Sequence, residues 1–141
     1  MQVTREGDYA LRAAIYLAVM HPRICSASEV SREQKIPIKF LARIMLKLVK
    51  QGVIKSLPGS KGGYRLSRAP KEIAFLTILE AVEGPLLLNS CLDEDFDDCD
   101  HEDICSMKLV WKRTQDLVAS YLSKVTLDQL TEPPCKQTIN T

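Results

Sequence analysis

The stretch PIKFLARIMLKLVKQGVIKSLPGSKGGYRLSR, residues 37–68, combines a helical pattern with a hairpin pattern. In its first half, one set of apolar residues recurs at the spacing of a single helix face: Leu41, Ile44, Met45 and Leu48. A basic set falls on another face: Lys39, Arg43, Lys47 and Lys50. Pro37 suits the first turn of a helix and Gly52 suits its end. We therefore expect a helix over about 37–51 with one packed face and one basic face.

The second half of this stretch predicts a two-stranded hairpin. Residues 53–54 and 64–66 have the composition of short strands, and the Pro- and Gly-rich loop 58–63 separates them. Glycines let a backbone approach a phosphate closely, and neighbouring basic side chains supply positive charge. The hairpin residues that we expect to contact DNA are Ser56, Gly59, Lys61 and Arg65.

Two helices are expected before this stretch. Thr4 can cap a helix that runs to about Met20, and Ser26 with Glu29 has the spacing of a capping box for a helix that runs to about Gln34. Three helices followed by a hairpin is the order of a winged helix-turn-helix domain, whose third helix enters the major groove of DNA. The predicted fold is therefore mainly α with a small β component.

The charge distribution agrees with a polyanion-binding domain. The net charge is only +1, yet residues 32–71 contain eleven Lys or Arg and a single acid. Lys39 and Arg43 are the best candidates for contacts with bases or phosphates, and Lys47 and Lys50 for phosphates. The sequence has no Walker-type loop, HExxH or nucleophile elbow, so we predict a protein that is not an enzyme and that binds double-stranded operator DNA.

The part after the hairpin contains an acidic cysteine segment and a long helix. A short helix over 76–83 ends at Gly84-Pro85, and CLDEDFDDCDHEDIC, residues 91–105, holds three of the five cysteines among eight acids. Apolar side chains then recur at steps of three and four, which predicts a helix of about twenty residues and a homodimer seam: Ile104, Met107, Trp111, Val118, Tyr121 and Val125, with Thr114. We expect a winged domain over 1–83, a cysteine loop over 84–106, a dimerisation helix and short terminal helix over 107–131, and a flexible tail over 132–141.

The cysteines are best interpreted as ligands or redox groups. No apolar run is long enough to cross a membrane, and the N-terminus lacks a signal-peptide layout. We therefore expect a cytoplasmic protein with reduced thiols. Cys91, Cys99 and Cys105, with His101, could hold zinc, although the usual close Cys-x₂-Cys pair is absent. A metal-free thiol sensor is a further alternative. We expect Cys25 to be a small buried residue.

Four further segments carry a resemblance to a known family: GDYALRAAIYLA (7–18), PGSKGGYRLSR (58–68), TILEAVEGP (77–85) and VTLDQL (125–130). Together with the three spaced cysteines, they make the chain resemble the winged-helix, iron–sulfur transcription regulators that include IscR and NsrR. The resemblance implies a bacterial homodimer that swaps its long helices. It also implies operator binding that an iron–sulfur cluster switches in response to redox state, nitric oxide or iron–sulfur status.

The same resemblance implies a ligand set for the cluster. Cys91, Cys99 and Cys105 would supply thiolates, which iron–sulfur clusters require. In the NsrR-like branch an acid of the partner subunit completes the set, and Asp8 stands at that position here. The IscR-like branch uses a histidine where this chain has Lys108, and His101 is the rival fourth ligand. This pattern favours a 4Fe–4S cluster, with 2Fe–2S as the alternative.

Overall fold

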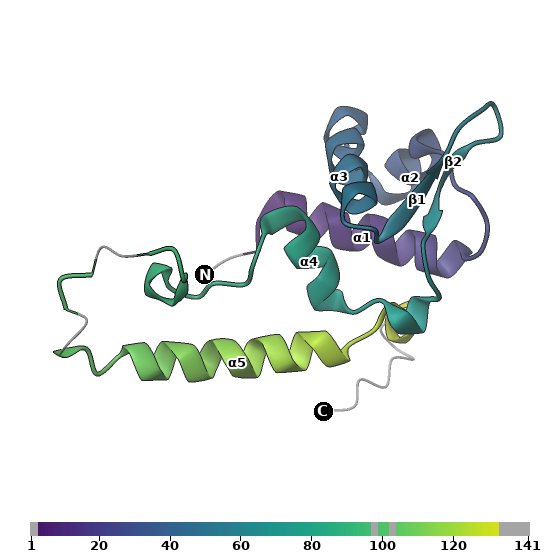
Figure 1. Ribbon diagram of the computed structural model, residues 1–141. Coiled ribbons are helices and arrows are strands. Elements are labelled where there is room, and N and C mark those ends of the chain that lie inside the picture. Colours follow the sequence, from purple (N-terminus) through teal and green to yellow (C-terminus); the bar gives the residue numbers. More distant parts are fainter. Residues whose placement is uncertain (1–2, 97–98, 102–103, 133–141) are drawn as a thin grey trace.

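The computed structural model describes residues 3–96, 99–101 and 104–132. It consists of a winged domain, which ends with α4, and an arm, which runs from Gly84 to the end of α5 (Figure 1). The helices and strands, in chain order, are α1 (Arg5–Met20), α2 (Ala27–Gln34), α3 (Ile38–Lys50), β1 (Ile54–Leu57), β2 (Gly63–Leu66), α4 (Phe75–Glu83) and α5 (Lys108–Lys124). Short 3₁₀ turns lie at Pro70–Glu72, Ser90–Leu92 and Leu127–Leu130. Cys135 and most of the predicted tail lie outside the described residues. This architecture confirms the predicted winged helix-turn-helix fold.

The helix ends follow from local sequence. The Thr4 hydroxyl accepts a hydrogen bond from the Gly7 amide at 3.2 Å, and the Ser26 hydroxyl accepts one from the Glu29 amide at 3.1 Å. These caps confirm the predicted starts of α1 and α2. Pro37 occupies the N-cap position of α3 rather than its first helical residue. Gly84 ends α4 at φ 84°, a backbone conformation that glycine adopts without strain.

The core of the winged domain forms where α1 packs against α3 and α4. The predicted apolar face of α3 is fully buried: Leu41, Ile44, Met45 and Leu48 each have 0% exposure. Ala10, Ala13 and Ala14 of α1 are equally buried, and their small side chains let the neighbouring helices approach closely. Burial of this face fixes which side of α3 turns toward solvent.

β1 and β2 pair antiparallel, with Ile54 opposite Leu66 at the base and Leu57 opposite Gly63 near the tip. Ile54 and Leu66 are buried, whereas the tip extends beyond the helices (Figure 1). The hairpin is therefore anchored at its base, and its exposed tip can contact a ligand.

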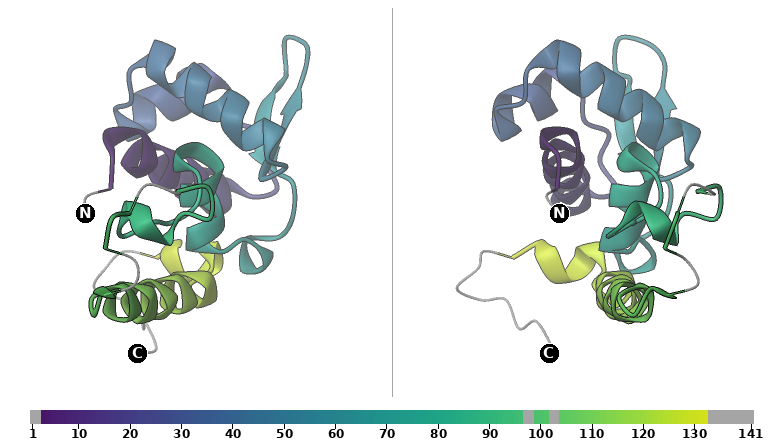
Figure 2. Two further views of the ribbon diagram at one scale, coloured as in Figure 1. Left: turned by 60° about the vertical axis from the view of Figure 1, so that its left-hand side comes forward. Right: turned by 90° about the vertical axis from the view of Figure 1, so that its left-hand side faces the viewer.

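The arm is hydrogen-bonded back to the winged domain at the end of α5. The Phe75 amide donates to the Val125 carbonyl at 2.8 Å, and the Leu127 amide donates to the Ile73 carbonyl at 3.0 Å. Val125 and Leu127 are buried, but α5 itself contains no buried residue. Figures 1 and 2 show α5 extending away from this joint, with the cysteine segment at its far end.

α5 differs from the predicted long helix at its start. It begins at Lys108 and has 17 residues, so Ile104 and Met107 precede it. Within the part of the chain that the structure describes, no helix is long and apolar enough to cross a membrane.

Candidate DNA-binding face and cysteine cavity

The solvent-facing side of α3 carries three of the four predicted basic residues. Lys39, Arg43 and Lys50 are exposed, and one helix face holds all of them. Leu46 lies in the middle of this face and is 69% exposed. Sequence reasoning did not single out Leu46, because an apolar residue in a helix is normally assigned to the core. Its position between basic residues on the same face was the available signal.

The Arg43 side chain is oriented by aromatic contacts. Its guanidinium carbon lies 4.9 Å from the centre of the Phe40 ring, within cation–π range. Phe40 in turn meets Tyr9 of α1 edge to face, with ring centres 5.4 Å apart. This stack connects α1 to the basic face of α3 and limits the directions that Arg43 can take.

Lys47 takes a different direction from the other three basic residues. Its Nζ lies 2.8 Å from Glu6 Oε1 of α1 and donates to the Val82 carbonyl of α4 at 3.2 Å. The structure therefore turns Lys47 toward the neighbouring helices. A phosphate contact by Lys47 stays a prediction from the sequence pattern alone.

The hairpin presents the predicted wing residues to solvent. Ser56, Gly59 and Lys61 are exposed, and Arg65 is half-buried. Lys55 lies directly opposite Arg65 in the antiparallel register, a relationship that sequence reasoning missed because it depends on strand register. Like charges in opposite positions of a hairpin destabilise it, and a phosphate between them would relieve that repulsion.

The three cysteines of the arm line one cavity of about 320 Å³, together with His101. Cys91 and Cys105 are half-buried, Cys99 is exposed, and all three thiols are free. Phe96 and Trp111 supply apolar walls. Among the residues placed by the structure, no three Cys, His, Asp or Glu side chains are close enough together to form a preassembled metal site. Three thiols and an imidazole are the kind of donors that soft, thiolate-bound metals or clusters use.

Cys105 lies outside α5, because that helix begins at Lys108 with Met107 as its N-cap residue. The apolar pattern that begins at Ile104 would put Cys105 in the first turn of the long helix, and the observed start of α5 contradicts this. Because the effect of a helix dipole falls off beyond the helix end, we do not expect α5 to stabilise a thiolate at Cys105.

Asp8 does not line the cysteine cavity of its own chain. It lies on α1, where its Oδ2 accepts a hydrogen bond from Arg12 Nε at 2.8 Å. This hydrogen bond raises the pKa of Arg12. The Asp8 and Arg12 side chains are 51% and 55% exposed, so the carboxylate is open to a partner molecule.

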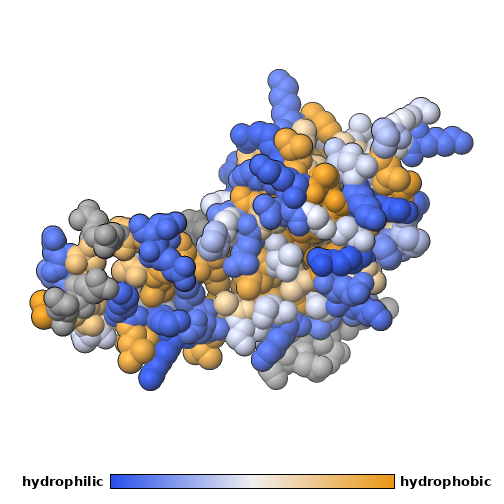
Figure 3. All heavy atoms as spheres, viewed as in Figure 1, coloured by the Kyte–Doolittle hydropathy of each residue, from blue (hydrophilic) through white to orange (hydrophobic). Residues whose placement is uncertain are grey.

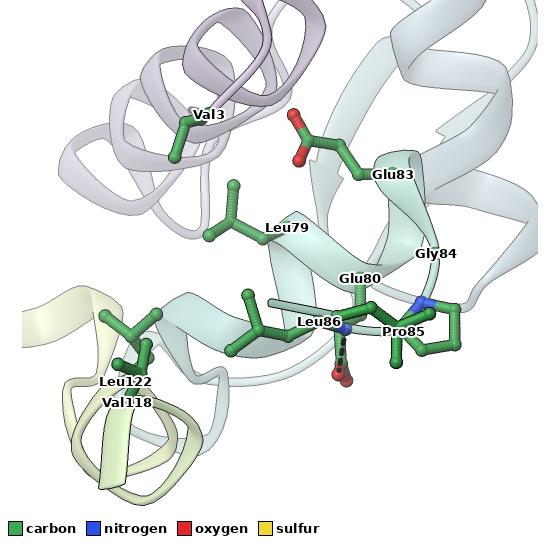
Figure 4. Close-up of a pocket in the computed structure, with 10 residues that line it drawn as sticks. Val3, Leu79, Glu80, Glu83, Gly84, Pro85, Leu86, Val118 and Leu122 are labelled. Carbon is green, nitrogen blue, oxygen red and sulfur yellow. Dashed lines mark hydrogen bonds between the residues drawn. The ribbon is translucent and has the colours of Figure 1, made fainter. Parts of the chain in front are cut away.

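The start of α1 is hydrogen-bonded to the end of α4, directly before the cysteine loop (84–106). One Glu83 carboxylate oxygen accepts hydrogen bonds from the Thr4 amide, at 2.9 Å, and from the Thr4 hydroxyl. Figure 4 shows Glu83 pointing toward the start of α1, beside a pocket of about 400 Å³ that α5 closes with Val118 and Leu122. The helix that carries Asp8 and the start of the cysteine loop are thus held together within one subunit.

A winged helix-turn-helix domain with a basic recognition face defines the class as a DNA-binding transcription regulator. The family model described as "Rrf2: Iron-dependent Transcriptional regulator" matches residues 3–133, and the chain belongs to the Rrf2 family. The family confirms that the protein is a transcription regulator rather than an enzyme, and it confirms the resemblance inferred from the sequence segments.

Relatives within this family include several named regulators. The chain is 30% identical to the HTH-type transcriptional regulator NsrR of Halalkalibacterium halodurans, over 92% of this chain and 90% of the relative. It is 28% identical to IscR of Pectobacterium carotovorum, over 92% and 79%. Among solved structures, CymR, the global cysteine regulator of B. subtilis, is similar with a TM-score of 0.74 and 26% identity, over 93% and 96%. Because regulators with different names share this fold, the fold alone does not define the bound group.

Proposed function

We propose that the protein is a homodimeric regulator whose operator binding depends on an iron–sulfur cluster. Cys91, Cys99 and Cys105 would hold the cluster, and Asp8 of the partner subunit would supply the fourth ligand. The observation that carries this proposal is the cavity in the arm that all three thiols line. A 4Fe–4S cluster is favoured over 2Fe–2S by the NsrR-like pattern of three cysteines and one carboxylate.

The cluster, when bound, would supply a centre that reacts with oxidants or nitric oxide. The residues of the chain would determine how this reactivity affects the fold. Binding by the three thiolates would tie together the parts of the arm that carry them, and Phe96 and Trp111 would shield one side of the cluster. The hydrogen bonds from Thr4 to Glu83 would then connect the start of the cysteine loop to α1 of the same subunit.

The exposed face of α5 supports the homodimer. Val110, Leu117 and Tyr121 are 62%, 73% and 47% exposed, and with Thr114 they recur at steps of four, three and four. Figure 3 shows apolar residues at the free edge of the arm. Of the predicted seam, Val125 and, through the pocket, Val118 pack within the subunit, whereas Thr114 and Tyr121 belong to this outer stripe. Val110 and Leu117 complete the stripe and were not part of the predicted seam. A second copy of α5 would cover the stripe in the manner of a coiled coil.

Such a dimer would place its two α3 helices in successive turns of the major groove, about one helical turn apart. Lys39 and Arg43 would reach bases or phosphates, and Lys50 would hold a phosphate. The Lys55 and Arg65 side chains on the hairpin would contact backbone phosphates of the adjacent groove. Cluster loss would release the arm, alter the spacing of the two α3 helices and so change operator affinity.

A zinc-binding regulator is the second candidate, because His101 lines the cavity with the three cysteines and would complete a Cys₃His site. Anaerobic purification separates the two. Iron, sulfide and visible absorption are expected for the cluster, whereas colourless protein with one zinc per subunit would support zinc. Colourless, metal-free protein would instead support a thiol sensor.

Operator binding of cluster-loaded and cluster-free protein is then compared at one salt concentration, since affinity depends steeply on salt. Each of the single variants Cys91→Ser, Cys99→Ser and Cys105→Ser should lose the cluster. The matched control Cys25→Ala should retain it, because Cys25 is fully buried in the winged domain. Equal affinities of the two forms would contradict the switch while leaving DNA binding intact.

A further inference from the structure

Lys47 is the one predicted recognition residue of α3 that the structure ties into its own domain. Its ammonium group lies 2.8 Å from the Glu6 carboxylate in the first turn of α1. The same Nζ donates to the Val82 carbonyl in the last turn of α4, at 3.2 Å. One side chain therefore joins three helices at a single point.

Both partners of Lys47 have a physical reason to retain it. The carbonyls of the last helical turn lack intrahelical donors, and a cation near a helix C-terminus interacts favourably with the helix dipole. Lys47 thus satisfies a carbonyl of α4 that its own helix leaves open. The side chains of Lys47 and Glu6 are only 44% and 26% exposed, so this ion pair is less screened by water than a fully exposed pair.

We infer that Lys47 is a positioning residue for α3, which fixes the helix against α1 and α4 and does not contact phosphate. The inference rests on the proposed role of α3 in DNA binding. If it holds, Glu6 and Val82 engage two of the three donors of the ammonium group. Loss of this group then shifts α3 and the Arg43 and Lys39 side chains that the helix presents. Lys50, three residues further on and exposed, makes none of these contacts and serves as the matched control.

The salt dependence of binding distinguishes the two roles. A lysine that neutralises a phosphate releases a counterion, so its removal lowers the slope of log affinity against log salt by about one unit per subunit. A positioning lysine weakens binding without changing that slope. The experiment uses the intact dimer and an operator duplex selected from random sequence, with Lys47→Met, Glu6→Gln, the double variant and Lys50→Met.

We expect Lys47→Met and Glu6→Gln each to weaken operator binding by about three- to tenfold at unchanged slope, with the double variant no weaker than either single one. Lys50→Met should make the dependence of log affinity on log salt less steep, by about one unit per subunit. Glu6→Gln is nearly isosteric, so it tests the pair even where Lys47→Met impairs folding. A lowered slope for Lys47→Met, additive losses, or wild-type binding by Glu6→Gln would each overturn the inference.

The proposed function is tested separately in the same assay. The double variant Lys39→Ala, Arg43→Ala should lose operator binding. If it does and Glu6→Gln binds like the wild type, only the positioning role fails. If it does not, α3 is not the reading helix and the proposed function fails with it.

Discussion

Cys25 and Tyr64 exchange two backbone hydrogen bonds, from the Cys25 amide to the Tyr64 carbonyl at 2.9 Å and from the Tyr64 amide to the Cys25 carbonyl at 2.7 Å. This isolated bridge joins the segment before α2 to strand β2. Strand β2 is therefore fixed relative to the helix-turn-helix as well as to its partner strand β1. The orientation of the wing toward DNA depends on this contact.

Gly63→Ala should disturb this bridge. Gly63 has φ 151°, and a Cβ there would lie 2.7 Å from the Cys25 carbonyl carbon and overlap its oxygen. Since both obstacles are backbone atoms, we expect the free energy of unfolding to fall by about 2 kcal/mol. Urea denaturation measures the change. Ser60→Ala, an exposed change at the wing tip, should stay within about 0.5 kcal/mol of the wild type, and equal stability of the two variants would contradict the argument.

Cys25 should resist alkylation while the arm cysteines react. Burial, with Glu29 nearby, raises the pKa of the Cys25 thiol to about 11. Because the thiolate is the nucleophile, Cys25 stays protonated and unreactive at pH 8. We expect iodoacetamide to label Cys91, Cys99 and Cys105 of cluster-free protein first, as peptide mass spectrometry would show. Denaturant should make Cys25 react, and equal labelling in the native protein would be the contrary result.

Much of the winged domain was predictable because its signals are local. The caps at Thr4 and Ser26, and the buried face of α3, depend on residues within a few positions of one another. The capping box at α2 is only half formed, however. The Glu29 carboxylate accepts hydrogen bonds from Arg23, at 2.6 Å, and from Tyr16, at 3.1 Å. A competing arginine close in space takes the side chain that the sequence pattern assigns to the cap.

The remaining differences arise from contacts between distant segments. The direction of Lys47 is set by Glu6 and Val82, which no periodicity within α3 reveals. The division of α5 into an inner and an outer apolar face depends on where α4 packs, so Leu117 was not assigned to the seam. The sequence identified the three cysteines, and the structure adds that they share a cavity with His101. The role of Asp8 stays a prediction.

Leu117→Glu should dissociate the proposed dimer. Leu117 is 73% exposed in the centre of the outer stripe, so a charge there is tolerated by the monomer but must be desolvated against a second α5. We expect light scattering to report a monomer of half the wild-type mass. Val19→Glu makes the same kind of change on α1, where the valine is 49% exposed, and should leave the dimer intact. A dimeric Leu117→Glu would place the interface elsewhere.

Glu29 should contribute stability that disappears in acid. The Arg23 hydrogen bond lowers the pKa of the Glu29 carboxyl, against the opposing effect of burial. An acid whose pKa is lower in the folded state stabilises the fold above its unfolded pKa of about 4.3, and this contribution is lost as pH falls through the folded value. Glu29→Gln should therefore melt below the wild type at pH 7, and the two melting temperatures should converge toward pH 3. A gap of constant size would exclude the ionised pair as its source.

Leu46 should contribute to operator selectivity through apolar contact with thymine. It is 69% exposed on the face of α3 that also carries Arg43 and Lys50, and a leucine in the major groove can pack on the C5-methyl group of thymine. Replacing each operator thymine in turn by deoxyuridine removes only that methyl. At one or more positions the wild type should lose about two- to tenfold in affinity, and Leu46→Ala should lose nothing further there.

Ile38→Ala, at an exposed residue off the basic face, should keep the wild-type response. If Leu46→Ala responds to every deoxyuridine as the wild type does, Leu46 does not contact a thymine methyl, and the selectivity of this face comes from its basic residues alone.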